Sequence, residues 1–208
     1  GLGDVYKRQS LRRHEYVCDC SDIDDIIVFT ENCSMMVTKV DSKVFIGKNI
    51  VHVAVFKKKD LRTIYNMVYK DGDKGINFIK RFAVSGVTRD KLYKLSNSKK
   101  ESYVKYFSAN PNGEAEKITI NLRSNSKLKK LKWDVDFSDV IIKGRASRGN
   151  IITKNTIKNI ELKEKGLSTL KPRKIWFDDT VQRLNVDGRG DLLGEFRGED
   201  KILVVSQT

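Results

Sequence analysis

The sequence contains few of the residues on which several folds and active sites depend. It has 3 cysteines, 2 histidines and 2 prolines among 208 residues, and the cysteines are Cys18, Cys20 and Cys33. An odd number of cysteines in a chain of this size does not form a disulfide framework, so we expect reduced thiols and a cytosolic protein. A zinc site that joins the cysteines to His14 is disfavoured, because Cys-x-Cys is shorter than the usual spacing of structural zinc ligands. The cysteines are expected to be small, buried strand residues.

Motifs for catalysis and nucleotide binding are also missing. With 2 histidines and no Gly-x-Ser-x-Gly segment, the sequence gives little support to a hydrolytic triad. Residues 47–49 (Gly-Lys-Asn) lack the upstream glycine and the hydroxyl residue of a phosphate-binding loop. The glycines of residues 188–194 are one residue too widely spaced for a dinucleotide site, and no helix pattern follows them. We interpret residues 188–194 as a turn between strands.

Long hydrophobic runs are absent, whereas positive charge is in excess. No apolar run approaches the length of a membrane span, and no long basic amphipathic helix is visible, so we expect a soluble protein with no membrane partner. Lysine and arginine total 41 against 27 acidic residues, which gives a net charge of +14. Such an excess favours a polyanionic partner, because each phosphate that a cation neutralises releases condensed counterions. Nucleic acid is therefore the first expectation.

The pattern of short apolar segments predicts an all-β fold. More than ten such segments lie roughly ten residues apart, with few prolines and no convincing long helix, as in a sandwich, barrel or propeller. Residues 24–39 predict a hairpin, because two apolar runs flank the turn-forming Glu31, Asn32 and Ser34. Residues 147–154 repeat its second half and residues 199–206 its first. Recurrence at irregular multiples of roughly 40 to 50 residues favours a propeller-like fold of repeated blades.

The connections between these segments are predicted from turn residues. Residues 71–75 (Asp-Gly-Asp-Lys-Gly) and residues 110–113 (Asn-Pro-Asn-Gly) have the composition of tight turns. Residues 88–95 fit either a helical turn or a connector. Residues 161–171 are the clearest candidate for a linker.

Acidic residues offer a candidate divalent-metal site, since hard cations prefer carboxylates. They are Asp134, Asp136 and Asp139, with a second pair at Asp178 and Asp179. On a strand, Asp134 and Asp136 share one face and Trp133 and Val135 the other. A half-buried strand with a solvated acidic side explains the same pattern. A metal-dependent enzyme therefore stays an alternative, and we expect that no metal is bound.

The excess positive charge lies mainly at strand ends and in the adjacent connectors, where a propeller rim would present it outward. The candidate DNA-binding residues are Lys39, Lys43, Lys48, Lys80, Arg81, Lys143, Arg145, Arg148 and Lys154. Each of them alone fits an ordinary solvated side chain equally well. No aromatic-rich RNA-binding signature is present, so recognition of a duplex backbone is favoured over base stacking.

Four segments of the sequence are specific enough to compare with known families: residues 16–29 (YVCDCSDIDDIIVF), 51–60 (VHVAVFKKKD), 106–116 (YFSANPNGEAE) and 174–190 (KIWFDDTVQRLNVDGRG). They resemble the C-terminal region of the topoisomerase IV A subunit, which is part of the DNA gyrase A family, in the branch found in Bacteroides-like bacteria. The resemblance runs from about Leu11 to the end of the sequence.

This resemblance implies a β-pinwheel, a propeller relative with strand-exchanged four-stranded blades, that binds duplex DNA around a basic rim. It adds Arg183 and Arg189 to the expected DNA contacts. Residues 43–49 and 188–194 are at most degenerate versions of the box that promotes wrapping in gyrase, so gyrase-like chiral wrapping is not expected. None of the 7 tyrosines follows an arginine, so the DNA-cleaving tyrosine of the family is not in this sequence.

We also predict the limits of the domain and the protein to which it belongs. We expect a fragment with an incomplete ring, residues 1–10 as a non-native leader, and blades at roughly 16–70, 71–122, 123–171 and 172–208. The fragment needs no cofactor, whereas the parent enzyme would use ATP and Mg²⁺ through other domains and through the topoisomerase IV B subunit, in the cytoplasm at the nucleoid. The alternative function is a non-catalytic propeller scaffold that binds an acidic protein.

Overall fold

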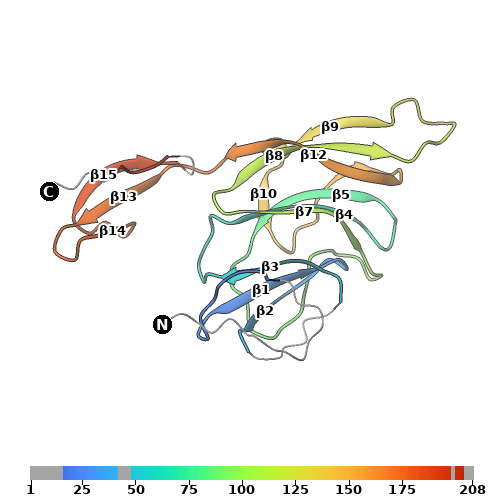
Figure 1. The fold of residues 1–208 in the computed structure, drawn as a ribbon. Helices are drawn as coiled ribbons and strands as arrows, with labels where there is room; N and C mark the ends of the chain where they lie inside the picture. Colours follow the sequence, from blue (N-terminus) through green and yellow to red (C-terminus); the bar gives the residue numbers. More distant parts are fainter. Residues whose placement is uncertain (1–15, 42–47, 198–199, 204–208) are drawn as a thin grey trace.

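The computed structural model describes residues 16–41, 48–197 and 200–203. Within these ranges the chain forms strands and a single 3-10 turn, η1 (Phe137–Asp139), and no helix long and apolar enough to cross a membrane (Figure 1). The strands are β1 (Asp25–Thr30), β2 (Ser34–Lys39), β3 (Ile50–Phe56), β4 (Ile64–Lys70), β5 (Asn77–Ala83), β6 (Tyr93–Lys94), β7 (Tyr103–Asn110), β8 (Glu114–Leu122), β9 (Lys132–Asp136), β10 (Ile142–Gly144), β11 (Asn150–Thr153), β12 (Ile157–Ser168), β13 (Arg173–Asp178), β14 (Arg183–Asn185) and β15 (Asp191–Phe196). The all-β prediction is confirmed.

The predicted hairpin of residues 24–39 is present as β1 and β2. The two strands pair antiparallel, with Asp25 opposite Lys39 and Thr30 opposite Ser34. Its turn holds Cys33 at a φ of 57°, in the left-handed region that disfavours a residue with a Cβ by roughly 1–2 kcal/mol. The Cys33 side chain is buried in the core beneath the turn, and this apolar burial offsets the backbone cost.

Only one of the three cysteines fits the expectation of a buried strand residue. Cys33 is buried, whereas Cys20 is partly exposed and Cys18 is exposed, because the chain before β1 has no strand structure among the described residues. All three are free thiols. Burial raises the pKa of Cys33 to about 12, so this thiol stays neutral and acts as a small apolar side chain.

Three sheets form the body of the domain. Sheet A has the strand order β3-β1-β2-β6, sheet B has β10-β5-β4-β7 with β11 also paired to β5, and sheet C has β12-β8-β9. Figure 1 shows the three sheets one above another, with sheet B in the middle. A first apolar core joins sheets A and B, and a second joins sheets B and C.

Sheet B is covered on both faces, so its central strands β4 and β5 are buried along nearly their whole length. In β4, Met67 faces the first core and Val68 faces the second, as the alternation of side chains along a strand requires. Full burial of an apolar side chain of this size stabilises the fold by roughly 1.5–3 kcal/mol. In β5 the same alternation places Phe82 in the first core and Ile79 in the second. The two cores therefore fix the register of both central strands.

Later segments of the chain return to earlier sheets. β6 follows β5 of sheet B but pairs with β2 of sheet A, and β10 and β11 follow β9 of sheet C but pair with β5 of sheet B. Stacked small sheets that exchange strands with their neighbours form a β-pinwheel. The described residues do not close a ring, so the pinwheel is incomplete, as the sequence predicted.

The strands group differently from the blades expected at residues 16–70, 71–122, 123–171 and 172–208. The limits at 70/71 and 122/123 fall inside the hairpins β4–β5 and β8–β9. The Asp71 carboxylate accepts the N–H groups of Asp73 and Lys74 at 3.0 and 2.9 Å, so residues 71–75 form a hairpin turn within sheet B. The crossover to sheet C is instead the turn at Gly113, whose N–H donates to Asn110 O at 3.1 Å. The expected leader, residues 1–10, lies outside the described residues.

The prediction of a linker at residues 161–171 is wrong. Most of this segment belongs to β12, which pairs with β8 through several register shifts. Exposed polar side chains along β12 hide the strand pattern from the sequence. Gly166 marks one irregularity, because a Cβ at this position would lie 1.8 Å from the carbonyl oxygen of Ala115. Only glycine permits that backbone approach.

Sheet D, with the order β14-β13-β15, follows β12 and is less buried than the others. Its apolar residues Leu184, Val186, Leu192 and Leu193 are exposed, and none of its residues belongs to either core. Figure 1 shows it to one side of the three stacked sheets. The repeat predicted at residues 199–206 lies partly outside the described residues, and residues 200–203 form no strand.

His52 predicts a pH dependence of stability. Its half-buried ring lies 5.7 Å from that of Phe107 and 6.3 Å from that of Tyr65, and burial lowers its pKa below the usual 6.5. The unfolded chain therefore takes up the proton first as the pH falls below 6.5, so the folded state loses stability towards acid. Wild type should lose more unfolding free energy between pH 7 and pH 5 than His52→Phe, measured by urea denaturation. Equal losses would contradict this prediction.

Candidate nucleic-acid interface

Two cations meet at the ring of Tyr93. The guanidinium carbon of Arg145 lies 4.5 Å from the ring centroid, and the ammonium of Lys91 lies 5.4 Å from it. A cation near an aromatic face is attracted by the ring quadrupole, by about 0.5–1 kcal/mol at an exposed site. The ring therefore holds two positive charges close together. We call Lys91, Tyr93 and Arg145 the Tyr93 cluster.

Hydrogen bonds fix the members of the Tyr93 cluster. Tyr93 Oη accepts the N–H of Thr88 at 2.8 Å, and this hydrogen bond contributes most to lowering the pKa of Tyr93. The Arg145 guanidinium donates to the carbonyl oxygens of Ser85 and Gly86. β6 carries Tyr93 and pairs with β2, whereas Arg145 follows β10, which pairs with β5. Strand exchange between sheets A and B therefore assembles this cluster from distant parts of the sequence.

β10 and the connection that follows it each add one exposed cation beside the cluster. Lys143 and Arg148 line a shallow hollow above β5, and the guanidinium carbon of Arg148 lies 5.9 Å from the Phe78 ring centroid. Gly149 lets this loop approach the sheet, because a Cβ there would lie 2.4 Å from Ile79 O. The loop thus holds its cations against a rigid strand, with their charged groups in solvent.

Lys80 does not lie at the surface. Its side chain is only 4% exposed, and its ammonium donates to the carbonyl oxygens of Leu95, Arg145 and Ser147 at 2.5, 2.7 and 3.3 Å. Burial lowers the pKa of Lys80 to about 8, so the group is mostly protonated at neutral pH. Since these contacts occupy the ammonium, we remove Lys80 from the predicted DNA contacts. It holds the segment after β6 and the β10–β11 loop against β5.

Arg81 also differs from its predicted role, because its side chain is 2% exposed. Its Nε donates to Asn66 Oδ1 at 2.9 Å, and its Nη2 donates to Gly113 O at 2.9 Å and to Thr169 Oγ1 at 3.0 Å. Burial lowers the pKa of this guanidinium, and the nearby Glu116 carboxylate opposes the shift. Arg81 therefore joins sheet B to sheet C and cannot reach DNA from this position.

The other predicted cations are exposed but do not form one group. Lys39 ends β2, Lys48 precedes β3, and Lys154 follows β11. Arg183 and Arg189 are exposed on sheet D. Lys43 lies outside the described residues. The structure thus brings together only Lys143, Arg145 and Arg148 from the predicted set.

Sequence reasoning missed two sources of positive charge, the single residue Lys91 and the basic run at residues 123–132. Lys91 was not predicted, because its proximity to Arg145 depends on the exchange of strands between sheets. Residues 123–132 were not among the predicted DNA contacts, although they contain 5 basic residues and no acidic one. That run of positive charge was the available signal. Residues 123–131 connect β8 to β9, and together with Lys132, the first residue of β9, we call them the β8–β9 tip.

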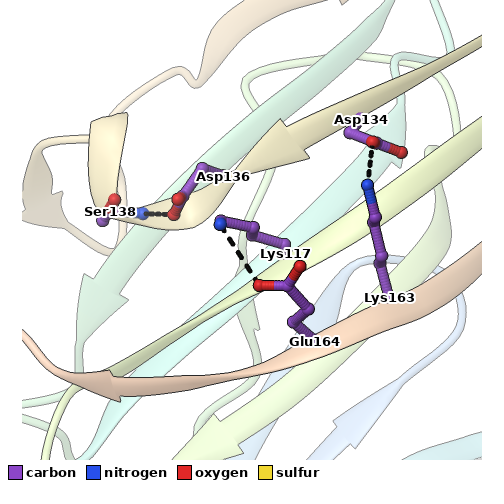
Figure 2. A network of polar contacts seen from close by, with 6 residues as sticks. All are labelled: Lys117, Asp134, Asp136, Ser138, Lys163 and Glu164. Carbon is purple, nitrogen blue, oxygen red and sulfur yellow. Dashed lines mark hydrogen bonds and ion pairs between the residues drawn. The ribbon is translucent and has the colours of Figure 1, made fainter.

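The predicted acidic site is a network of charges on sheet C (Figure 2). Asp134 accepts hydrogen bonds from Thr119 Oγ1 at 2.7 Å and from Lys163 Nζ, and the Lys163 bond contributes most to lowering the pKa of Asp134. Asp136 Oδ1 accepts the Ser138 N–H at 2.8 Å and thereby caps η1. Both carboxylates are thus bound to protein donors.

A neighbouring ion pair completes this charged face. Lys117 Nζ lies 3.2 Å from Glu164 Oε2, across β8 and β12. The part of the chain that the structure describes contains no group of three or more His, Cys, Asp or Glu residues that could hold a metal ion. The outer face of sheet C is therefore a solvated surface of paired charges, and the metal-dependent alternative gains no support from its geometry.

Fold and charge together define a class of protein. Strand-exchanged stacked sheets form a bladed, propeller-type domain, and its surface carries clustered lysine and arginine side chains on connections between strands. A surface of clustered positive side chains suits contact with a polyanion such as a phosphate backbone.

Comparison with known proteins gives the family. The model of the topoisomerase C-terminal domain of Bacteroidota matches residues 2–165, so the chain belongs to this family. The A subunit of DNA topoisomerase 4 from Borreliella burgdorferi strain B31 is 26% identical over 163 residues, which cover 78% of this chain and 24% of that protein. The chain thus spans about a quarter of the length of this relative. No solved structure matches the chain.

Proposed function

We propose that this domain binds duplex DNA for the A subunit of a type II topoisomerase and presents a DNA segment for strand passage. The observation that carries the proposal is the Tyr93 cluster with its neighbours Lys143 and Arg148, where four cations lie close together on β10 and on connections of adjacent sheets. In the parent enzyme, ATP and Mg²⁺ act through other domains and through the B subunit, and the complex works on the nucleoid in the cytoplasm.

The mechanism is electrostatic. Lysine and arginine side chains neutralise phosphates along the duplex without reading bases, so affinity depends little on sequence. Bending a duplex by about 40–90° over the blades would cost on the order of 1–6 kcal/mol, and additional phosphate contacts would offset this cost. The catalytic tyrosine belongs to another part of the parent enzyme, and this domain supplies affinity and a preferred DNA geometry.

The salt dependence of DNA affinity tests the proposal. For a 30-base-pair duplex, log Kobs should fall linearly with log salt, by about 0.9 per neutralised phosphate. The variant Lys91→Gln, Lys143→Gln, Arg148→Gln should make the slope shallower by up to about 2.7, because it removes three contacts. Fluorescence anisotropy measures both slopes over a KCl range of about 0.1 to 0.4 M, in which the Debye length shortens from about 10 Å.

The control variant has the same change of charge at another exposed site. Lys57, Lys58 and Lys59 form the turn between β3 and β4, and their replacement by Gln should leave the slope nearly unchanged. A wild-type affinity that does not vary with salt would refute DNA binding by these cations. It would favour the alternative of a propeller scaffold for a protein partner.

A further inference from the structure

The β8–β9 tip, residues 123–132, displays a second group of cations. Its exposed basic residues are Arg123, Lys127, Lys129, Lys130 and Lys132. No acidic residue interrupts this run in the sequence. Figure 1 shows the connection between β8 and β9 extending from the upper sheet, away from the body of the domain. The tip is therefore open to a large partner.

The backbone of the tip is held in place by hydrogen bonds. Leu122 donates its N–H to Leu131 O at 2.8 Å, and Leu128 donates its N–H to Asn125 O at 2.9 Å. The Leu128 side chain packs against the second core. Arg123 N–H donates to Thr156 O at 2.9 Å, which ties the tip to the turn between β11 and β12. The cations are thus carried by an anchored loop.

Among the described residues, Arg123, Lys127, Lys129 and Lys130 form no ion pair with a carboxylate, whereas Lys132 in β9 interacts electrostatically with Asp134. The ion pairs in this part of the chain join Arg89 to Asp25, Lys117 to Glu164 and Lys163 to Asp134. On sheet C, negative charge is therefore matched by Lys117 and Lys163 along the strands, whereas Arg123, Lys127, Lys129 and Lys130 in the tip have no matching carboxylate. Unmatched charge on an anchored loop favours an anionic partner.

The β5 strand separates the tip from the Tyr93 cluster. Gly144, which precedes Arg145, pairs with Ala83 at one end of β5, and Thr153 pairs with Asn77 at the other end. The six steps along β5 from Asn77 to Ala83 span about 20 Å. Lys154 and the tip lie at the Asn77 end, because the turn after Thr153 holds the Arg123 backbone. The backbone anchors of the two groups of cations are thus separated by about the length of six base pairs of duplex.

We infer that the β8–β9 tip is a second phosphate-binding element, which contacts the duplex held by the Tyr93 cluster at a point about half a helical turn away. This inference rests on the proposed function and extends it, because one domain then binds two separated stretches of one DNA segment. With a slope of about 0.9, each phosphate contact contributes a factor of about 8 to the affinity at 0.1 M salt, relative to the affinity at 1 M salt. Two contacts at the tip contribute about 60-fold.

The test compares two double variants. The tip variant carries Lys129→Gln and Lys130→Gln, and the control variant carries Lys117→Gln and Lys163→Gln. Both double variants remove two charges from sheet C, but the control removes lysines that are ion-paired in Figure 2. On a 30-base-pair duplex, the tip variant should bind about 10- to 60-fold more weakly at 0.1 M salt, with a slope shallower by about 1.8. On a hairpin with a stem of six base pairs, about 20 Å long, its loss should stay near twofold, because the Tyr93 cluster still binds that short duplex.

The outcomes separate this inference from the proposed function. If the tip and control variants lose the same affinity on the long duplex, the second element is refuted. The variant of Lys91, Lys143 and Arg148 would still change the salt slope in that case, and DNA binding would stand. If wild type shows no salt dependence on either DNA, the proposed function itself fails. Equal losses on both DNAs would also refute the inference, since the tip would then act alone.

Discussion

Replacing Arg81 by methionine is expected to lower the free energy of unfolding by about 3–5 kcal/mol, the usual cost of removing one member of a buried charge network. Methionine keeps most of the volume of the side chain but makes none of its hydrogen bonds. Arg81 donates to Asn66 in sheet B and to Gly113 and Thr169 beside sheet C. The substitution therefore leaves buried acceptors from two sheets without donors.

The largest part of this effect comes from Glu116, which is 4% exposed. Its Oε2 accepts from Asn66 Nδ2 at 2.9 Å, and its Oε1 accepts from Tyr106 Oη and Ser108 Oγ. Arg81 supplies the nearest buried positive charge, and the chain Arg81–Asn66–Glu116 links the two charges through one amide. Without Arg81, the Glu116 carboxylate is a buried charge with neutral donors only, which is costly at low dielectric.

Urea denaturation of Arg81→Met, of Glu116→Gln and of the double variant measures this effect. The double variant should be less destabilised than the sum of the single variants, because it removes both charges. Arg183→Met is the matched control: Arg183 is exposed on β14, so its loss should change stability by no more than about 0.5 kcal/mol. A loss below about 1 kcal/mol in Arg81→Met would contradict the prediction.

Arg81 and Lys80 also show where sequence reasoning reaches its limit. Adjacent cations in β5 resemble a solvent-facing strand end, since charged side chains are rarely buried without a partner. The structure buries both because sheet B is covered on two sides, so Lys80 faces the first core and Arg81 the second. The residues of a strand do not show whether its sheet lies in the middle of a stack, because that position depends on how all the sheets pack.

Local features were predicted well for a physical reason. The β1–β2 hairpin and the turn at residues 71–75 depend on alternation and on Asp and Gly chemistry within a few residues. The Asn110–Gly113 turn was predicted from the same chemistry, but its role as a crossover between sheets was not. Turn residues determine that the chain reverses, whereas the pairing partner of the next strand is decided by distant segments.

The Tyr93 cluster illustrates the same limit for function. Arg145 was predicted from its position next to a strand, but its contact with Tyr93 and its proximity to Lys91 arise from the pairing of β6 with β2 and of β10 with β5. The family match supports DNA binding in general terms. Only the fold shows which of the cations lie close together.

Replacing Lys80 by methionine is expected to weaken DNA binding although Lys80 touches no DNA. Its ammonium holds the carbonyl oxygens of Leu95, Arg145 and Ser147, so it aligns the segment after Tyr93 with the loop that carries Arg145. Loss of one phosphate contact through a displaced loop would weaken binding by a factor of about 8 at 0.1 M salt. We therefore regard Lys80 as a positioning residue for the Tyr93 cluster.

Stability alone would not reveal this role. Each unpaired carbonyl costs about 1–3 kcal/mol, but the buried ammonium is itself unfavourable. A pKa lowered from 10.5 to about 8 corresponds to roughly 3 kcal/mol in favour of the neutral form. The two effects oppose each other in Lys80→Met, so the net change in unfolding free energy should be modest. DNA affinity should be measured below the unfolding transition, with Lys105→Met, an exposed lysine of β7, as the control of equal charge.

The pH profile of DNA affinity distinguishes positioning from a general loss of structure. Lys80 loses its proton as the pH rises through about 8, and a neutral amine has one donor fewer for its three carbonyl partners. The titratable groups packed around it keep their protons in this range, because burial raises the pKa of Cys33 to about 12 and also raises the pKa of Tyr69.

Wild-type affinity should therefore fall between pH 7 and pH 9, as Lys80 loses its proton. Lys80→Met should bind more weakly at pH 7 and show no such fall, and Lys105→Met should follow the wild-type profile. If Lys80→Met bound DNA as tightly as wild type at pH 7, or kept the same pH dependence, the buried ammonium would have no part in arranging the cations of the Tyr93 cluster.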